Sequence, residues 1–208
     1  GWAYDPQRTF SLNLRAFLRK AREVVEKKLR GREILGVAVV VPGPYDVATD
    51  TVTNKRLPEL NSLCVKQTLR EELGLYDYYV DEDVKFAVRA YRALAAQNDS
   101  EVLYYACIGE GVGGATIHNG NVLRGLNAAA GDVGQLLDRD GRTFESKLSL
   151  RVFALACGLE VLASDDEAAL LARIAQRAQA DFPCYQEALL RAAEGVGDML
   201  FPIAWLLD

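Results

Sequence analysis

A glycine-rich run over residues 108–135, IGEGVGGATIHNGNVLRGLNAAAGDVGQ, constrains the fold of this chain more than any other feature. The apolar segment at 102–108 that leads into it predicts a strand. Because glycine adopts positive φ and has no Cβ, such a turn lets backbone N–H groups approach an anionic ligand. A dinucleotide-binding turn or a P-loop would open a helix. Here residues 115–118 read as a second strand and Asn119-Gly120 is a hairpin signal, so the run predicts a strand–turn–strand hairpin.

Composition and charge exclude several classes of protein. Half of the 208 residues are apolar, which is enough to bury a large core in one or two domains. The net charge of −5 provides no basic surface for nucleic acid. No apolar run approaches the roughly 20 residues of a membrane span and no segment resembles a signal peptide, so we expect a cytoplasmic protein without a membrane partner. The cysteines are expected to be buried, reduced thiols: Cys64, Cys107, Cys157 and Cys184.

Strand-like and helix-like segments alternate along the chain, which predicts an α/β fold. A polar turn at Asn98-Asp99-Ser100 is the expected boundary between two domains. Asn13 is expected to cap the first helix, and Ser164 to begin a capping box that opens a later one. The expected helices span 13–29, 62–73, 83–97, 164–180 and the segment from 185 onward, and the expected strands span 34–41 (buried), 51–53, 76–80 and 102–108.

Three groups of motifs, in the expected order, resemble the ROK family of repressors, open reading frames and sugar kinases. The segment ILGVAVVVPGP at 34–44 is similar to the family's GIGIAVPGP, and VDEDVK at 80–85 occupies the place of its V-E-N-D-A-N. The glycine-rich run is similar to a GTGIGGG turn followed by RG-N-AAG and E-x-G-H. The resemblance implies a two-lobed actin-like or sugar-kinase (ribonuclease H-like) ATPase fold. Residues 1–98 would be part of the N-terminal lobe, and 99–208 the C-terminal lobe with a helical dimerisation region.

The resemblance also implies a fold that is incomplete at both ends. The family's first hairpin carries a D-x-G-G-T phosphate loop, which residues 1–11 do not resemble. Residues 204–208 resemble the end of a helix that precedes one more strand and a glycine-rich adenosine-binding turn. We therefore expect this sequence to be the middle of a longer protein.

The motif at 80–85 carries the residue that the resemblance assigns to catalysis. The family's matching Asp accepts the proton of the sugar hydroxyl, which makes Asp83 the candidate base. The alternative is that Asp83 only caps its helix. Glu82 and Lys85 replace two asparagines of the family. An ionised Glu is an acceptor only, so these replacements are expected to remove donor capacity and to alter the charge of the site.

A second sugar-binding cluster is implied by Asp132, Gln135 and Glu145. Asp132 replaces a Glu, and Gln135 replaces a His that contacts both sugar and zinc in the family. The segment 138–145 contains none of the cysteines of the family's zinc site, and zinc needs about four ligands, so we expect no zinc. Glu145 keeps the place of a sugar contact, and the alternative is a solvated acidic residue at the start of a helix.

The family's phosphate-binding turn corresponds to Gly109, Glu110, Gly111, Gly113 and Gly114. Glu110 stands where the family has a Thr, and a carboxylate beside a polyphosphate is repulsive unless a metal ion intervenes. ATP and Mg²⁺ are therefore expected only if kinase activity is retained. The single histidine, His118, is expected to lie at the surface.

These features favour the sugar-sensing, effector-binding core of a ROK-type transcriptional repressor with an eroded kinase site. The effector would bind between the lobes, in a cleft formed by Glu82, Asp83, Asp132, Gln135 and Glu145. A neutral sugar is expected, because four carboxylates accept hydroxyl hydrogen bonds but repel a sugar phosphate. We expect a homo-oligomer, dimer or tetramer, that contacts DNA only through a helix-turn-helix domain absent from this chain. The alternatives are an ATP-dependent hexose or acylamino-sugar kinase, and a ligand-free scaffold kept for oligomerisation.

Overall fold

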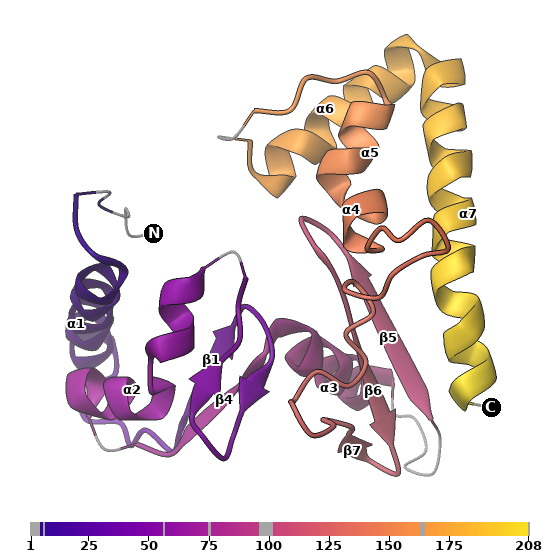
Figure 1. The fold of residues 1–208 in the computed structure, drawn as a ribbon. Coiled ribbons are helices and arrows are strands. Elements are labelled where there is room, and N and C mark those ends of the chain that lie inside the picture. The colour runs from indigo at the N-terminus through magenta and orange to yellow at the C-terminus, as the bar shows by residue number, and fades with distance from the viewer. Residues whose placement is uncertain are drawn as a thin grey trace. The chain divides into compact units, whose positions relative to one another are not determined.

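The computed structural model describes residues 5, 7–55, 57–74, 76–95, 102–162 and 165–207. They belong to two units, shown in Figure 1. The first unit comprises residues 1–86 together with 125–128, and the second comprises 87–124 and 129–208. The expected boundary turn at 98–100 lies outside the described residues. Residues 125–128 return the chain to the first unit in the second half of the glycine-rich run.

The first unit combines short strands with helices. Strand β1 (Val37–Val41) pairs in parallel with β4 (Tyr78–Glu82), with Val39 opposite Val80. Strands β2 (Tyr45–Asp46) and β3 (Thr51–Val52) form an antiparallel pair. The helices are α1 (Phe10–Lys28), the 3-10 helix η1 (Pro58–Ser62), α2 (Val65–Leu73) and α3 (Asp83–Ala95), whose first turn belongs to this unit.

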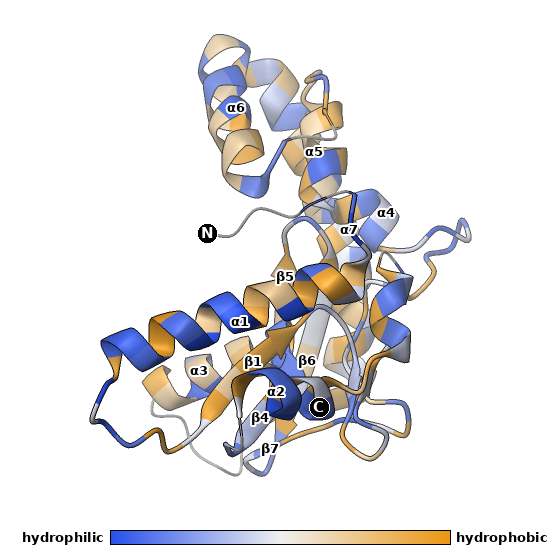
Figure 2. Ribbon diagram, turned by 90° about the vertical axis from the view of Figure 1, so that its left-hand side faces the viewer, coloured by the Kyte–Doolittle hydropathy of each residue, from blue (hydrophilic) through white to orange (hydrophobic). Residues whose placement is uncertain are grey.

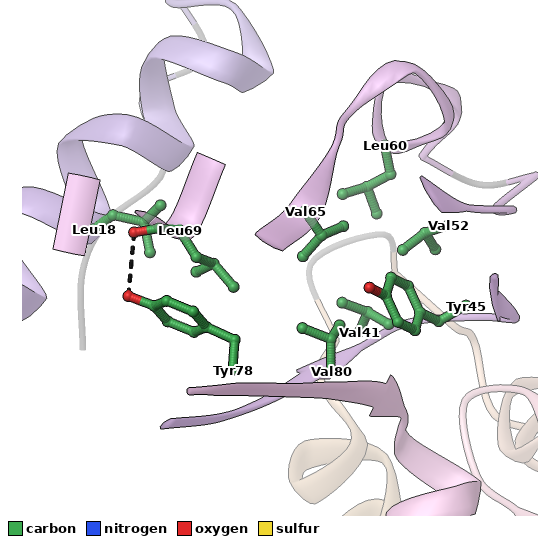
Figure 3. Packing of buried hydrophobic residues seen from close by; sticks show 9 residues of the cluster. All are labelled: Leu18, Val41, Tyr45, Val52, Leu60, Val65, Leu69, Tyr78 and Val80. Atoms are coloured by element: carbon green, nitrogen blue, oxygen red, sulfur yellow. Dashed lines mark hydrogen bonds between the residues drawn. The ribbon is translucent and has the colours of Figure 1, made fainter. Parts of the chain in front are cut away.

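One hydrophobic core joins the four strands with α1, η1 and α2, and Figure 3 shows its members. Tyr45 is completely buried, and its hydroxyl donates a hydrogen bond to Asp50 Oδ1 at 2.7 Å. The Tyr78 hydroxyl donates to the Gly74 carbonyl at 2.9 Å, which ties β4 to the end of α2. The buried side chains are Leu18, Val41, Tyr45, Val52, Leu60, Val65, Leu69, Tyr78 and Val80.

Helix α1 is amphipathic, with hydrophilic and hydrophobic residues alternating along it in Figure 2. Its polar side contacts α2, where the Glu72 carboxylate forms ion pairs with Arg15 Nη1 at 2.6 Å and with Arg19 Nε at 2.9 Å. The hydrogen bonds from Arg19 and Arg15 lower the pKa of the Glu72 carboxyl. A buried carboxylate is stable only with such partners, so this cluster fixes the contact between α1 and α2.

The start of α1 differs from the expectation that Asn13 caps it. Thr9 is the N-cap, and its hydroxyl accepts the Leu12 N–H. Asn13 lies inside the first turns and is 2% exposed. Its Nδ2 donates to the Asp5 carbonyl at 2.8 Å and its Oδ1 accepts the Asp5 N–H at 3.0 Å. Asn13 therefore holds the preceding chain against the helix, because its amide can donate and accept at once.

Two further expectations need correction. Strand β1 begins at Val37 and is not buried throughout, since Val40 is 56% exposed. The cysteines are thiols, but only Cys157 is buried, whereas Cys64 and Cys107 are exposed. Apolar neighbours in the sequence indicated that the strand and the cysteines would be buried. They do not show which of these side chains other segments actually cover.

The second unit contains the expected hairpin. Strands β5 (Leu103–Ile108), β6 (Val112–His118) and β7 (Asn121–Val122) form an antiparallel sheet in that order. Asn119 and Gly120 have φ of 47° and 77°, as a two-residue type I′ turn requires. The strand–glycine turn–strand prediction is confirmed. His118 is exposed, also as expected.

Among the described residues, four helices follow the sheet in the second unit, which also contains residues 87–95 of α3: α4 (Glu145–Leu148), α5 (Leu150–Ala156), α6 (Glu167–Ala180) and α7 (Phe182–Leu207). Helix α7, drawn in yellow in Figure 1, contacts each of the other three. Asp166 caps α6 by accepting the Ala169 N–H at 2.8 Å, whereas the expected cap, Ser164, lies outside the described residues. None of the helices within the described ranges is long and apolar enough to cross a membrane.

Candidate functional site

The junction between β4 and α3 presents the candidate base. Strand β4 ends at Glu82, which is buried, and α3 begins at Asp83, which is exposed. Asp83 Oδ1 accepts the Val84 N–H at 2.7 Å, so this carboxylate lies in the first turn, where the helix dipole favours negative charge. The position suits a helix-stabilising role and also leaves the carboxylate accessible to a ligand. The role of Asp83 as a base stays a prediction.

Lys85 and Glu82 form a buried ion pair. The Lys85 side chain is 1% exposed, and its Nζ pairs with Glu82 Oε2 one turn away. The same ammonium donates to the Ala128 carbonyl at 2.7 Å. The structure pairs the two opposite charges that these replacements introduce, and their effect on sugar recognition stays a prediction. The added positive charge offsets the added negative one, and the ammonium supplies donors within the pair.

Asp81 is a buried polar residue that sequence reasoning did not single out. It is completely buried in β4. Its Oδ1 accepts the Glu82 N–H at 3.0 Å, and its Oδ2 accepts the Tyr79 hydroxyl at 3.3 Å. These bonds fix the backbone immediately before the candidate base. The only signal in the sequence is a third carboxylate beside Glu82 and Asp83.

The glycine turn is shorter than the motif suggests. Gly109, Glu110 and Gly111 connect the strands, whereas Gly113 and Gly114 lie within β6. The Gly109 N–H donates to the Gly111 carbonyl at 2.8 Å, and the Gly109 carbonyl accepts the Leu150 N–H at 2.7 Å. At least one amide of the turn is thus engaged by the protein itself.

Two carboxylates border this turn. Glu110 Oε1 lies 3.7 Å from Arg151 Nη2, and Glu110 is half-exposed. A Cβ built on Gly109 would lie 3.4 Å from Glu167 Oε1, so the Glu167 carboxylate faces the first glycine of the turn. Glu167 follows the turn by more than fifty residues, and nothing local in the sequence indicates its approach. The two carboxylates outnumber the one guanidinium, Arg151, that lies beside Glu110, so the turn is less favourable for an anion.

Other glycines of the run serve packing. A Cβ on Gly114 would lie 2.0 Å from Tyr104 Oη, and one on Gly134 would lie 1.8 Å from the Val112 carbonyl oxygen. The Tyr104 hydroxyl donates to the Gly131 carbonyl at 3.0 Å. Burial, and then the charge of Asp132, raises the pKa of that hydroxyl. The segment around 131–134 therefore lies directly on β6, and its glycines permit the contact.

The second predicted cluster is partly assembled within the second unit. The Glu145 N–H donates to the Gly134 carbonyl at 2.9 Å, which brings Glu145 beside the Gly134-Gln135 pair. Glu145 Oε2 accepts the Val112 N–H at 3.2 Å, and the residue is half-buried. Glu145 is therefore not a freely solvated residue. Asp132 is half-buried and Gln135 is exposed.

The Asp138 carboxylate accepts backbone hydrogen bonds within the segment where the family resemblance places zinc. Asp138 Oδ1 accepts the N–H groups of Asp140 and Arg142 at 2.8 and 2.9 Å, and Asp138 Oδ2 lies 2.6 Å from Lys147 Nζ. The ion pair with Lys147, followed by the hydrogen bond from the Arg142 N–H, lowers the pKa of Asp138 to about 2. Within the described part of the chain, no three His, Cys, Asp or Glu side chains are grouped to hold a metal ion. The absence of zinc stays a prediction, and metal analysis of protein purified without chelator is its test.

Asp138→Asn is expected to lower stability at neutral pH. The folded-state pKa of about 2 lies below the ordinary value of 3.8, so this carboxyl stabilises the fold above about pH 4. That stabilisation is lost as the pH falls towards 2. Urea unfolding at pH 7, 4, 3 and 2 should show a smaller loss between pH 4 and 2 for Asp138→Asn than for the wild type. Asp140→Asn, in the same turn but exposed, is the control, and equal pH profiles for wild type and Asp138→Asn would contradict the prediction.

The ROK family profile matches residues 6–158, well over half of the chain. This chain belongs to the ROK family. Among characterised relatives, a glucokinase of Halalkalibacterium halodurans is 26% identical over 119 residues, covering 55% of this chain and 36% of that protein. The chain thus spans little more than a third of the length of this relative.

Solved structures show the same ROK fold. A ROK glucokinase from Streptomyces griseus, in complex with glucose and AMPPNP, has a TM-score of 0.71 at 19% identity, over 93% of this chain and 69% of that one. A ROK transcriptional regulator, a homologue of the E. coli MLC protein, has a TM-score of 0.72 at 17% identity, over 95% and 54%. The α/β, actin-like ATPase fold predicted from the motifs is confirmed. Kinases and regulators share this fold, so it does not choose between them.

Proposed function

We propose that this chain is the sugar-sensing, effector-binding core of a ROK transcriptional regulator whose kinase site is eroded. The glycine turn carries this proposal. Glu110 replaces a hydroxyl residue of the ROK pattern, Glu167 faces Gly109, and the Gly109 N–H already donates to Gly111. A nucleotide phosphate at this turn would meet two carboxylates in place of a neutral cradle.

The proposed effector is a neutral sugar. Its proposed contacts are the residues of the two motif groups: Glu82, Asp83, Asp132, Gln135 and Glu145. A carboxylate accepts hydroxyl hydrogen bonds, each contributing about 1.5–3 kcal/mol. A sugar phosphate would add negative charge near residues that are already acidic, which disfavours it.

The partners follow from the regulator proposal. Effector binding would shift the protein between two conformations and thereby act on a helix-turn-helix domain outside this sequence. Assembly into a dimer or tetramer is proposed to involve the helical part of residues 99–208.

A ROK sugar kinase is the second candidate. The exposed Asp83 carboxylate at the β4–α3 junction favours it, because a base must reach the sugar hydroxyl. In that case ATP and Mg²⁺ would be required, with the remaining phosphate contacts supplied from outside this sequence.

Calorimetric titration of the full-length protein tests the effector site. Neutral hexoses and N-acetylhexosamines are titrated beside their 6-phosphates, with wild type, Asp132→Ala and the exposed control Asp140→Ala. We expect binding of a neutral sugar that Asp132→Ala weakens at least tenfold, about 1.4 kcal/mol, and that Asp140→Ala leaves unchanged. Tight binding of a sugar phosphate that is indifferent to Asp132→Ala would refute this site.

A further inference from the structure

Lys85 joins two segments of the first unit that lie far apart in the sequence. Its ammonium pairs with Glu82 at the end of β4 and donates to the Ala128 carbonyl, 43 residues later, at 2.7 Å. The residues 125–128 belong to the first unit although the chain on either side belongs to the second. Lys85 is therefore placed to hold this segment against the start of α3.

The backbone conformation of Ala128 indicates that the surrounding structure fixes this contact. Ala128 is buried and has a φ of 57°, in the left-handed region that a residue with a Cβ rarely adopts. Such a conformation persists only when the surroundings determine it. The Ala128 carbonyl accepts a hydrogen bond from the Lys85 ammonium, and the Lys85 side chain is only 1% exposed. Lysine is almost never buried to this degree unless it is paired.

We propose that Lys85 is a positioning residue, which holds the Glu82 carboxylate ionised and fixed while it fastens residues 125–128 to the start of α3. The inference rests on the proposed function only in treating Glu82 as a sugar contact. The ROK pattern has an asparagine at both positions. In this chain Glu82 and Lys85 replace these two neutral residues with a negative and a positive charge that pair with each other. A fixed, ionised carboxylate offers acceptors alone, and the effector must present a hydroxyl donor there.

A double-mutant cycle in the full-length protein tests the pairing. Lys85→Met leaves the Glu82 carboxylate buried without this ammonium, and it should strongly lower the folding equilibrium constant. Adding Glu82→Gln removes the stranded charge, and the double variant should recover at least tenfold relative to Lys85→Met. Lys20→Met is the matched control, because Lys20 and Glu23 have the same spacing but are 65% and 68% exposed, and little change is expected.

Two readouts separate positioning from general destabilisation. The ¹³C shift of the Glu82 carboxyl at pH 7 should be that of an ionised group in the wild type and move towards the protonated value in Lys85→Met. Amide hydrogen exchange of residues 125–128 should accelerate in Lys85→Met more than exchange of the β5–β6 hairpin.

The outcomes are distinguishable from a failure of the proposed function, because none of these measurements needs a sugar. If Lys85→Met does not fold, recovery of folded protein in the double variant supports the proposal. Additive effects of the two substitutions, a double variant as impaired as Lys85→Met, or unchanged exchange at residues 125–128 would overturn it.

Discussion

Gly134→Ala is expected to prevent stable folding of the second unit, whereas Gly197→Ala should be neutral or stabilising by about 0.5–1 kcal/mol. An alanine Cβ at 134 would lie 1.8 Å from the Val112 carbonyl oxygen, a backbone atom that cannot rotate away. Val112 is also the first residue of β6, and its N–H donates to Glu145. Relief of the clash would therefore break the contact between β6 and α4, at an expected cost above about 4 kcal/mol.

Gly197 provides the matched comparison. It lies in α7 with no atom within 4 Å of a built Cβ, and alanine has the higher helix propensity. Neither glycine has a positive φ, so the two variants differ in packing and not in backbone strain. Urea unfolding followed by circular dichroism measures both. A Gly134→Ala protein within about 1 kcal/mol of the wild type would show that segment 131–134 does not lie on β6 as described.

Sugar phosphorylation by the full-length protein is expected to be negligible, far below a turnover of about 1 s⁻¹. The physical reason is the pair of carboxylates at the glycine turn, Glu110 and Glu167, which oppose the charge of a nucleotide phosphate. Glu110→Thr alone should not restore turnover, because Glu167 remains. Combined with Glu167→Gln, it should measurably strengthen binding of a non-hydrolysable ATP analogue.

A coupled assay over a panel of hexoses decides between regulator and kinase. The decisive control is Asp83→Asn, because this residue would be the base in a kinase. Wild-type turnover of about 1 s⁻¹ or more that Asp83→Asn abolishes would establish the kinase. Turnover that persists in Asp83→Asn would point to a contaminating enzyme.

The candidate site could be predicted only in part. The motifs placed Asp83 at a strand–helix junction and Glu145 at a helix start, and the structure has both there. They did not indicate that Gly113 and Gly114 lie in a strand, nor that Asp138 accepts backbone N–H groups of the segment that corresponds to the family's zinc site. A motif fixes the order of residue types along the chain, whereas a contact depends on which other segment lies against it.

The sequence by itself determined the family, the α/β fold and the β5–β6–β7 hairpin. Local conformation suffices for the hairpin, because Asn119-Gly120 takes the positive φ values that a two-residue turn needs. Only the tertiary structure decided that Lys85 meets Ala128, that Glu167 faces Gly109 and that Gly134 lies on Val112. These partners are separated by more than twenty residues in each case, and many pairings would satisfy the same side chains. Packing of the whole unit selects one of them.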